Sequence, residues 1–139
     1  MYIGLIPDNP VFEGEHLTLC WLGHEPTQLV MRVATDIAEV VSVWLQEKPS
    51  LWWLYDWDAL EGRTDDTVRV GLVSGTFMGR LRAFRTCCEN LGLNQSEYLW
   101  NPHITSQFKG EDYPDEVGWA YAERNLLEPF KFSRCLVLR

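Results

Sequence analysis

Two copies of one short pattern, histidine followed two positions later by threonine, stand far apart in this sequence, as His16 with Thr18 and His103 with Thr105. On a β-strand, residues i and i+2 point to the same face, so each copy would place an imidazole beside a hydroxyl. The apolar residue between them would point into the core and hold the strand in place. If the two strands lie together in one sheet, two imidazoles and two hydroxyls converge on one small volume.

Such a set suits hydrolysis or transfer at a phosphodiester. A neutral imidazole can take a proton from the attacking water or hydroxyl, and a protonated imidazole can donate one to the leaving oxygen. Histidine suits both tasks because its unperturbed pKa of about 6.5 lies close to working pH. The threonine hydroxyls can hydrogen-bond the non-bridging oxygens as the phosphorus becomes five-coordinate. This chemistry requires no metal ion and no cofactor, and from the pattern alone two solvated strand histidines stay an open alternative.

The elements that would position these residues follow from hydrophobic spacing. Short or alternating apolar runs predict β-strands, and apolar positions three and four residues apart predict helices. The expected strands cover residues 2–6, 15–22, 51–57, 67–73, 98–108 and 130–138, and the expected helices cover 27–48 and 77–91. The two halves repeat one pattern, in which a strand carries the histidine and helices cover the opposite face. We therefore expect one pseudo-symmetric α+β domain over residues 1–139.

Charge limits the partners of this domain. The formal net charge is -8, from 20 acidic and 12 basic residues. A long duplex or a tRNA needs a basic stripe that neutralises many phosphates, and this balance does not favour one. A small anionic ligand needs only a few local donors. We therefore expect a small cyclic nucleotide or a short oligonucleotide as substrate, and no long duplex nucleic acid.

Hydropathy bears on the location of the protein. No apolar run approaches the roughly 18 residues that a membrane span needs. The first residues lack a basic flank and reach Pro7 and Asp8 too soon for a signal peptide. These observations predict a cytoplasmic protein with no membrane partner, and no pattern in the sequence indicates its oligomeric state.

The chain has four cysteines: Cys20, Cys87, Cys88 and Cys135. They include no C-x-x-C pair, and their spread argues against a zinc site. Reduced, buried thiols are the interpretation that we prefer. If the strand over residues 15–22 is regular, the thiol of Cys20 shares the face of the first histidine and could line the site, although nothing nearby marks it as a nucleophile.

The residues around both motifs resemble a known family. The segment from His16 to Gly23 closely resembles the first motif of the 2H phosphoesterase superfamily, which includes the 2′-5′ RNA ligase-like enzymes. In both, the His-x-Thr strand continues through apolar residues to a Leu-Gly turn. The segment from Asn101 to Thr105 resembles the second motif, in which proline often precedes histidine. The start, from Tyr2 to Pro7, resembles the family's first strand.

This resemblance implies a two-lobed domain with a concave antiparallel sheet that carries both motifs and has its helices on the outer face. It implies that His16 and His103 are catalytic and that Thr18 and Thr105 bind the phosphate. It also implies three substrate classes: RNA ends with a 2′,3′-cyclic phosphate, 2′-5′-linked oligonucleotides and cyclic nucleotides. Some phage members of the family destroy cyclic-oligonucleotide immune signals. After the second motif the family commonly continues with leucine, whereas this chain has Ser-Gln-Phe-Lys at 106–109, which leaves the substrate open.

Four further residues are candidates for substrate binding: Tyr2, Cys20, Trp100 and Lys109. Lys109 lies just beyond the second motif and could reach a phosphate, and Trp100 could stack on a base. The aromatic stretch of residues 52–57 is expected mainly in the core. The arginines of the second helix, Arg85 among them, are expected on a solvated basic face, and His24 is expected in a solvated turn.

Together, the motifs and the resemblance predict a metal-independent phosphodiesterase that acts on a cyclic nucleotide or oligonucleotide, or on a 2′,3′-cyclic phosphate. Two alternatives stay open. One is RNA end repair, by opening of a terminal cyclic phosphate or by 2′-5′ ligation. The other is a non-enzymatic protein that sequesters a nucleotide.

Overall fold

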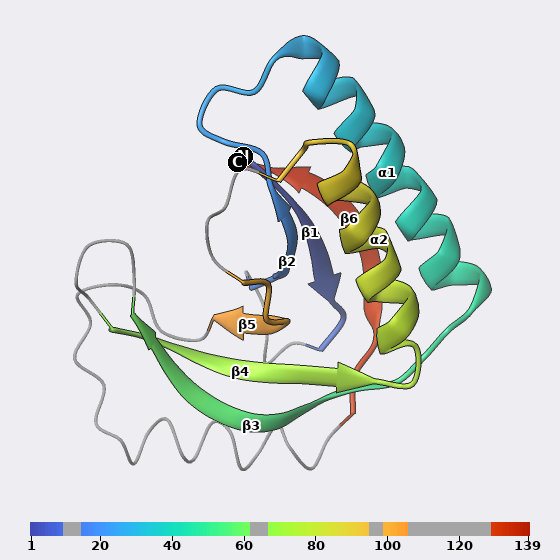
Figure 1. Cartoon of the computed structure of the whole chain (residues 1–139). Helices are drawn as coiled ribbons and strands as arrows, with labels where there is room; N and C mark the ends of the chain where they lie inside the picture. Colours follow the sequence, from blue (N-terminus) through green and yellow to red (C-terminus); the bar gives the residue numbers. More distant parts are fainter. Residues whose placement is uncertain (10–14, 62–66, 95–98, 106–128) are drawn as a thin grey trace.

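The computed structural model describes residues 1–9, 15–61, 67–94, 99–105 and 129–139, with the backbone alone for 56–61 and 67–70 (Figure 1). Within these ranges the elements in chain order are β1 (Tyr2–Pro7), β2 (Leu17–Trp21), α1 (Gln28–Glu47), β3 (Trp52–Glu61), β4 (Thr67–Gly75), α2 (Met78–Asn90), β5 (His103–Thr105) and β6 (Phe132–Leu138). The strands form an antiparallel sheet in the order β3-β4-β5-β2-β1-β6. The chain is therefore an α+β protein, as its sequence predicts.

The predicted elements occur in the predicted order, and their ends differ. The hairpin of β3 and β4 is longer than expected, whereas β5 comprises only His103–Thr105. Residues 106–108, which were expected to continue this strand, lie outside the described residues. Strand β2 begins at Leu17, so His16 directly precedes it. Neither helix combines the length and the apolar character needed to cross a membrane, a finding that applies to the described part of the chain.

Helix α1 begins and ends where local chemistry requires it. The side-chain oxygen of Thr27 accepts a hydrogen bond from the N–H of Val30 at 3.2 Å, which caps the first turn, and Pro49 cannot continue the helix. Ser42 attaches α1 to β6, because its hydroxyl donates to the carbonyl of Cys135 at 2.9 Å and accepts from the N–H of the same residue at 2.8 Å. The buried residues recur along one side of the helix: Ala34, Ala38, Val41 and Leu45.

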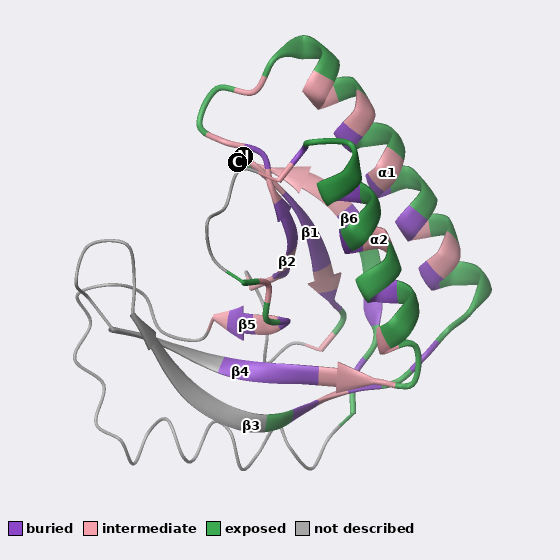
Figure 2. Ribbon diagram, in the orientation of Figure 1, coloured by how far each residue is buried: buried purple, intermediate pink, exposed green. Residues whose placement is uncertain are grey.

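Both helices cover one face of the sheet, where the strands bury their apolar side chains (Figures 1 and 2). Trp44 of α1 meets Phe84 of α2 with ring centroids 5.3 Å apart. Towards the β3–β4 end, Trp52 is fully buried beside Gly75, where a Cβ atom would lie 2.5 Å from the indole. Glycine at this position makes room for the largest side chain of the core. We call the face of the sheet opposite the helices the far face.

The pairing of β1 with β2 contains a β-bulge. Ile3 pairs with Cys20, but the next residue, Gly4, pairs with Thr18, so Leu19 is the extra residue of β2. Leu19 and Cys20 are both fully buried. The regular alternation expected over residues 15–22 therefore stops at Thr18, and the residues beyond it change face.

Candidate functional site

The two motifs come together through one backbone pair at the centre of the sheet. Leu17 of β2 pairs with Ile104 of β5 in antiparallel register, and both side chains are fully buried in the core under the helices. Because side chains alternate along a strand, the residues that flank this pair project to the far face. Continuing the register by one residue in each direction sets each motif histidine across from the threonine of the other motif. All four of these side chains are half-buried.

Stacking holds the ring of His16. The ring of Tyr2 lies nearly parallel to it, with centroids 4.5 Å apart and 19° between the planes. Gly4 lies beside this contact: a Cβ atom there would lie at an ordinary contact distance of 3.4 Å from Cδ2 of His16, but 2.9 Å from Cδ1 of Leu138, which would have to shift. The sequence suggested Tyr2 as a substrate-binding residue, which stays a prediction, and it gave no sign of Gly4, whose role depends on a contact across strands.

The surroundings of His16 favour its neutral form. Its Nε2 lies 3.1 Å from Oγ1 of Thr18. Burial lowers the pKa of His16 below its ordinary value of 6.5, and the charge of His103 lowers it further. This second effect arises because the two imidazoles are close enough to interact electrostatically. At neutral pH, His16 is therefore able to accept a proton.

The backbone orients the ring of His103. Its Nδ1 donates to the carbonyl of Asn101 at 2.6 Å. Because a carbonyl oxygen only accepts, Nδ1 carries a proton, and Nε2 is the nitrogen that can exchange one. The carbonyl of Pro102 accepts from the N–H of Val73 at 3.0 Å, which ties the approach to β5 to the neighbouring β4. The sequence could not predict the role of Asn101, since any residue there supplies a carbonyl.

Trp100 supports the first motif from the core. Its Nε1 donates to the carbonyl of Thr18 at 2.9 Å. The guanidinium groups of Arg82 and Arg85 lie 5.6 and 5.7 Å from the centre of its ring. The structure thus places this indole against α2, and its stacking on a base stays a prediction.

Arg85 is a buried structural residue, and the solvated position expected for it is wrong. Only 5% of it is exposed. Its Nη1 donates to the carbonyl of Leu19 at 2.7 Å, and its Nε donates to Glu89 at 3.1 Å. These bonds hold the bulged backbone directly after the first motif. A buried polar group needs such partners, but helical spacing alone does not reveal them.

The position expected for Cys20 is also wrong. The bulge at Leu19 shifts the alternation of β2, so the thiol of Cys20 is buried towards α2 and does not line the far face. There it shares a hydrogen bond with Cys88, which lowers the pKa of Cys20 and raises that of Cys88. Burial raises the pKa of Cys135 to about 12. All four cysteines are free thiols, and the expected burial fails only for Cys87, which is exposed.

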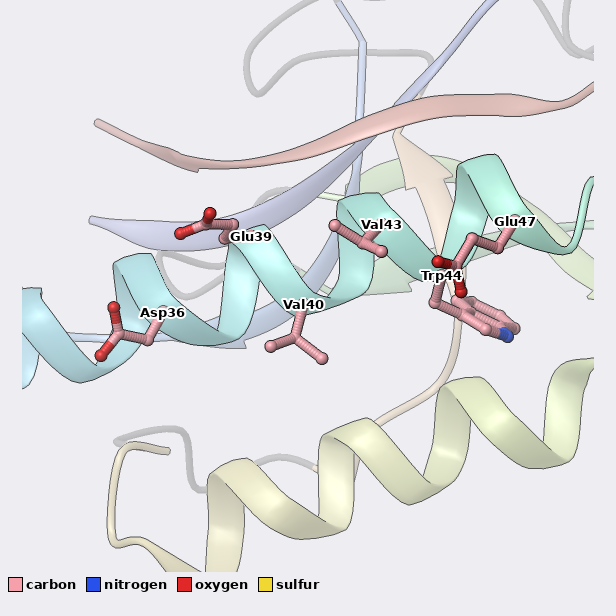
Figure 3. A pocket seen from close by; sticks show the side chains of 6 residues that line it. All are labelled: Asp36, Glu39, Val40, Val43, Trp44 and Glu47. Atoms are coloured by element: carbon pink, nitrogen blue, oxygen red, sulfur yellow. The ribbon is translucent and has the colours of Figure 1, made fainter.

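A groove of about 520 Å³ lies on the helix layer, on the side of the sheet away from the motifs (Figure 3). The side chains of Val40 and Trp44 extend from α1 towards α2 there. The groove is lined by Asp36, Glu39, Val40, Val43, Trp44 and Glu47. None of these residues belongs to either motif. Lys109 lies outside the described residues, within which no group of three or more His, Cys, Asp or Glu side chains could hold a metal ion.

Comparison of the chain with protein-family models, with curated proteins and with solved structures gives no significant match. The fold itself defines the chain as an antiparallel α+β protein. Its candidate site is defined by the geometry of the two motifs.

Proposed function

We propose that this chain is a phosphodiesterase of the 2H type, in which His16 and His103 exchange protons with the substrate and the motif threonines bind its phosphate. The observation that carries the proposal is the pairing of Leu17 with Ile104 at the centre of the sheet. Because the two strands are antiparallel, each motif histidine lies across from the threonine of the other motif. A pseudo-symmetric, two-lobed domain with a concave far face is part of this proposal. The sequence resemblance to 2H phosphoesterases supports the same assignment.

The unequal surroundings of the histidines support distinct roles for them. The pKa of His16 is lowered by burial and by the charge of His103, so His16 is the neutral partner and takes the proton of the attacking water or hydroxyl. His103 then donates a proton from Nε2 to the leaving oxygen, while the bond from Nδ1 to Asn101 keeps its ring in place. The two threonine hydroxyls stabilise the charge that develops on the non-bridging oxygens.

The substrate is a cyclic nucleotide or oligonucleotide, or a nucleotide with a 2′,3′-cyclic phosphate. The net charge of -8 supports a small anionic substrate over a structured RNA. A panel of cyclic dinucleotides, cyclic trinucleotides, cyclic mononucleotides and cyclic-ended RNA, incubated with a chelator, tests this assignment. We expect at least one small nucleotide to be consumed. Cleavage of the RNA ends alone would favour end repair, and tight binding with no product would favour sequestration.

Substitution of either histidine tests the mechanism. We expect His16→Ala and His103→Ala each to lower turnover by about 10²- to 10⁴-fold without loss of the fold, because each removes one proton-transfer group. His24→Ala is the matched control, since His24 is an exposed histidine in the turn after β2. Turnover close to that of the unmodified protein in either motif variant would exclude that residue from the mechanism. Activity that disappears with chelator and returns with a divalent ion would exclude the metal-independent scheme.

A further inference from the structure

The far face extends from the two motifs across β1 to β6, where it carries an exposed cation. Cys135 of β6 is buried under α1, with its backbone bonded to Ser42. Because side chains alternate along a strand, the preceding residue, Arg134, projects to the far face, and so does Leu136. Arg134 is exposed and Leu136 is half-buried.

The strand register places Arg134 in line with the first histidine. Ile6 of β1 pairs directly with Arg134. Leu5 pairs with Leu17, so the next residue in each direction sets Ile6 across from His16. The backbones of His16 and Arg134 are thus two strand spacings apart, about 10 Å. A long arginine side chain can lean inwards from that position.

Local charges leave this cation available. Among the described residues, no carboxylate is ion-paired with Arg134, and the nearby Asp8 accepts a hydrogen bond from the N–H of Lys131 at 3.0 Å. The far-face residues between Arg134 and His16 are apolar or small, namely Ile6 with its neighbours Gly4 and Leu136. Such a surface suits a sugar or a base between two anionic groups.

We propose that Arg134 binds a second phosphate of the substrate, one nucleotide away from the phosphate that is cleaved beside His16. A planar guanidinium can bind two phosphate oxygens at once, which provides position as well as charge. The inference rests on the proposed function, and it narrows the substrate class: the preferred substrate carries at least two phosphates, as a cyclic dinucleotide or a cyclic-ended dinucleotide does, and is not a cyclic mononucleotide.

The test compares substrates that differ by one nucleotide. Two pairs serve: a dinucleotide and a mononucleotide that both end in a 2′,3′-cyclic phosphate, and a cyclic dinucleotide with a 3′,5′-cyclic mononucleotide. We expect Arg134→Ala to lower kcat/KM for the two-phosphate member about ten- to a hundredfold, as loss of a charge-assisted hydrogen bond predicts, and to change the one-phosphate member less than about twofold. Arg134→Lys should restore part of the difference, because it keeps the charge.

Arg32→Ala is the control for net charge, since Arg32 is exposed on α1, on the opposite side of the sheet. An equal effect of Arg134→Ala on both members of a pair, or no effect on either, would overturn the second-phosphate site. The proposed function is tested separately, by turnover of any member in the unmodified protein. If turnover is absent, the same variants are compared by calorimetric titration with the same nucleotides, and equal Kd values for both members would again overturn the site.

Discussion

The two histidines occupy similar motifs but differ in what surrounds each ring. His16 is stacked on Tyr2 and loses solvent to burial, whereas His103 is held through Nδ1 by a backbone carbonyl. Their motif spacing is identical, so this difference arises from the surroundings of each motif: Tyr2 on the neighbouring β1 stacks on His16, whereas a carbonyl of its own segment holds His103. In the proposed mechanism, this difference sets the direction of proton transfer.

NMR titration of the imidazoles tests this difference. We expect the pKa of His16 to lie below 6.5, and His103→Asn to raise it, because the substitution removes a nearby positive charge. It should stay below the ordinary value, since burial is the larger cause. A lowered pKa means that the unfolded chain binds the proton more readily, so the contribution of His16 to stability is complete above about pH 6.5 and is lost as the pH falls through its folded-state pKa. A His16 titration unchanged in His103→Asn would show that the rings do not interact.

The contact at Gly4 makes a second prediction at this scale. Gly4→Val puts a Cβ atom 2.9 Å from Cδ1 of Leu138 and adds two methyl groups beside the ring of His16, which we expect to displace the ring. We expect kcat on the cleaved nucleotide to fall by about ten- to a hundredfold while the circular dichroism spectrum is retained, since small misplacements of a catalytic group are costly. Gly79→Ala is the control, because nothing lies within 4 Å of a Cβ atom at that position. Unchanged kcat in Gly4→Val would show that the stacked geometry does not matter.

At the scale of elements, the backbone of β2 is held by hydrogen bonds from side chains outside the strand. Trp100 and Arg85 donate to two consecutive carbonyls, those of Thr18 and Leu19, at the bulge. The bulge ends the far-face alternation directly after Thr18. A helix residue therefore fixes the backbone of the strand that carries the first motif.

Arg85→Met should destabilise the fold by about 3 kcal/mol, because it leaves the carbonyl of Leu19 buried without its donor. Its ion-pair partner Glu89 is 48% exposed and stays hydrated, so the ion pair itself adds little. Urea denaturation measures the difference. The control is Arg80→Met on the same helix, which is exposed and should change the free energy of unfolding by less than about 0.5 kcal/mol. Equal stability of the two variants would contradict the supporting role of Arg85.

Local patterns were sufficient to predict the elements but not the exceptions within them. Apolar residues at helical spacing predict helix 27–48, so the existence of α1 was predictable. The face that it buries was not: Leu29 and Val40 of the predicted stripe are exposed, and the buried residues are Ala34, Ala38, Val41 and Leu45. The bulge at Leu19 was not, because it is a property of the register between two strands and not of either strand alone. Cys20 was misplaced for this reason, and Arg85 was misplaced because its partner is a distant carbonyl.

At the scale of the whole molecule, the site is assembled from both halves of the sequence. β2 and β5 are neighbours in the sheet, flanked by β1 and β4. The sequence analysis had to assume that the two motif strands lie together in one sheet, because a single sequence does not give strand order. The outermost strand beyond β1 is β6, and it provides both the partner of α1 and the exposed Arg134.

Removal of β6 tests its importance for the whole molecule. A chain ending at Lys131 should lose cooperative unfolding, because β1 loses its outer neighbour and α1 loses its hydrogen bonds to Cys135. Differential scanning calorimetry provides the measurement. A chain that lacks only the exposed Arg139 should keep its Tm within about 1 °C. A cooperative transition in the shorter chain would show that the remaining elements fold without β6.

Ser42 and Cys135 are separated by 93 residues in the chain, so the hydrogen bonds between them cannot form until late in synthesis. At the usual pace of translation, on the order of ten seconds separate the two residues as they leave the ribosome. During that interval β6 has not yet been made, so the apolar side of α1 is exposed and can bind chaperones or other nascent chains. Expression of soluble protein should therefore respond to chaperone supply and to translation speed across this stretch of message.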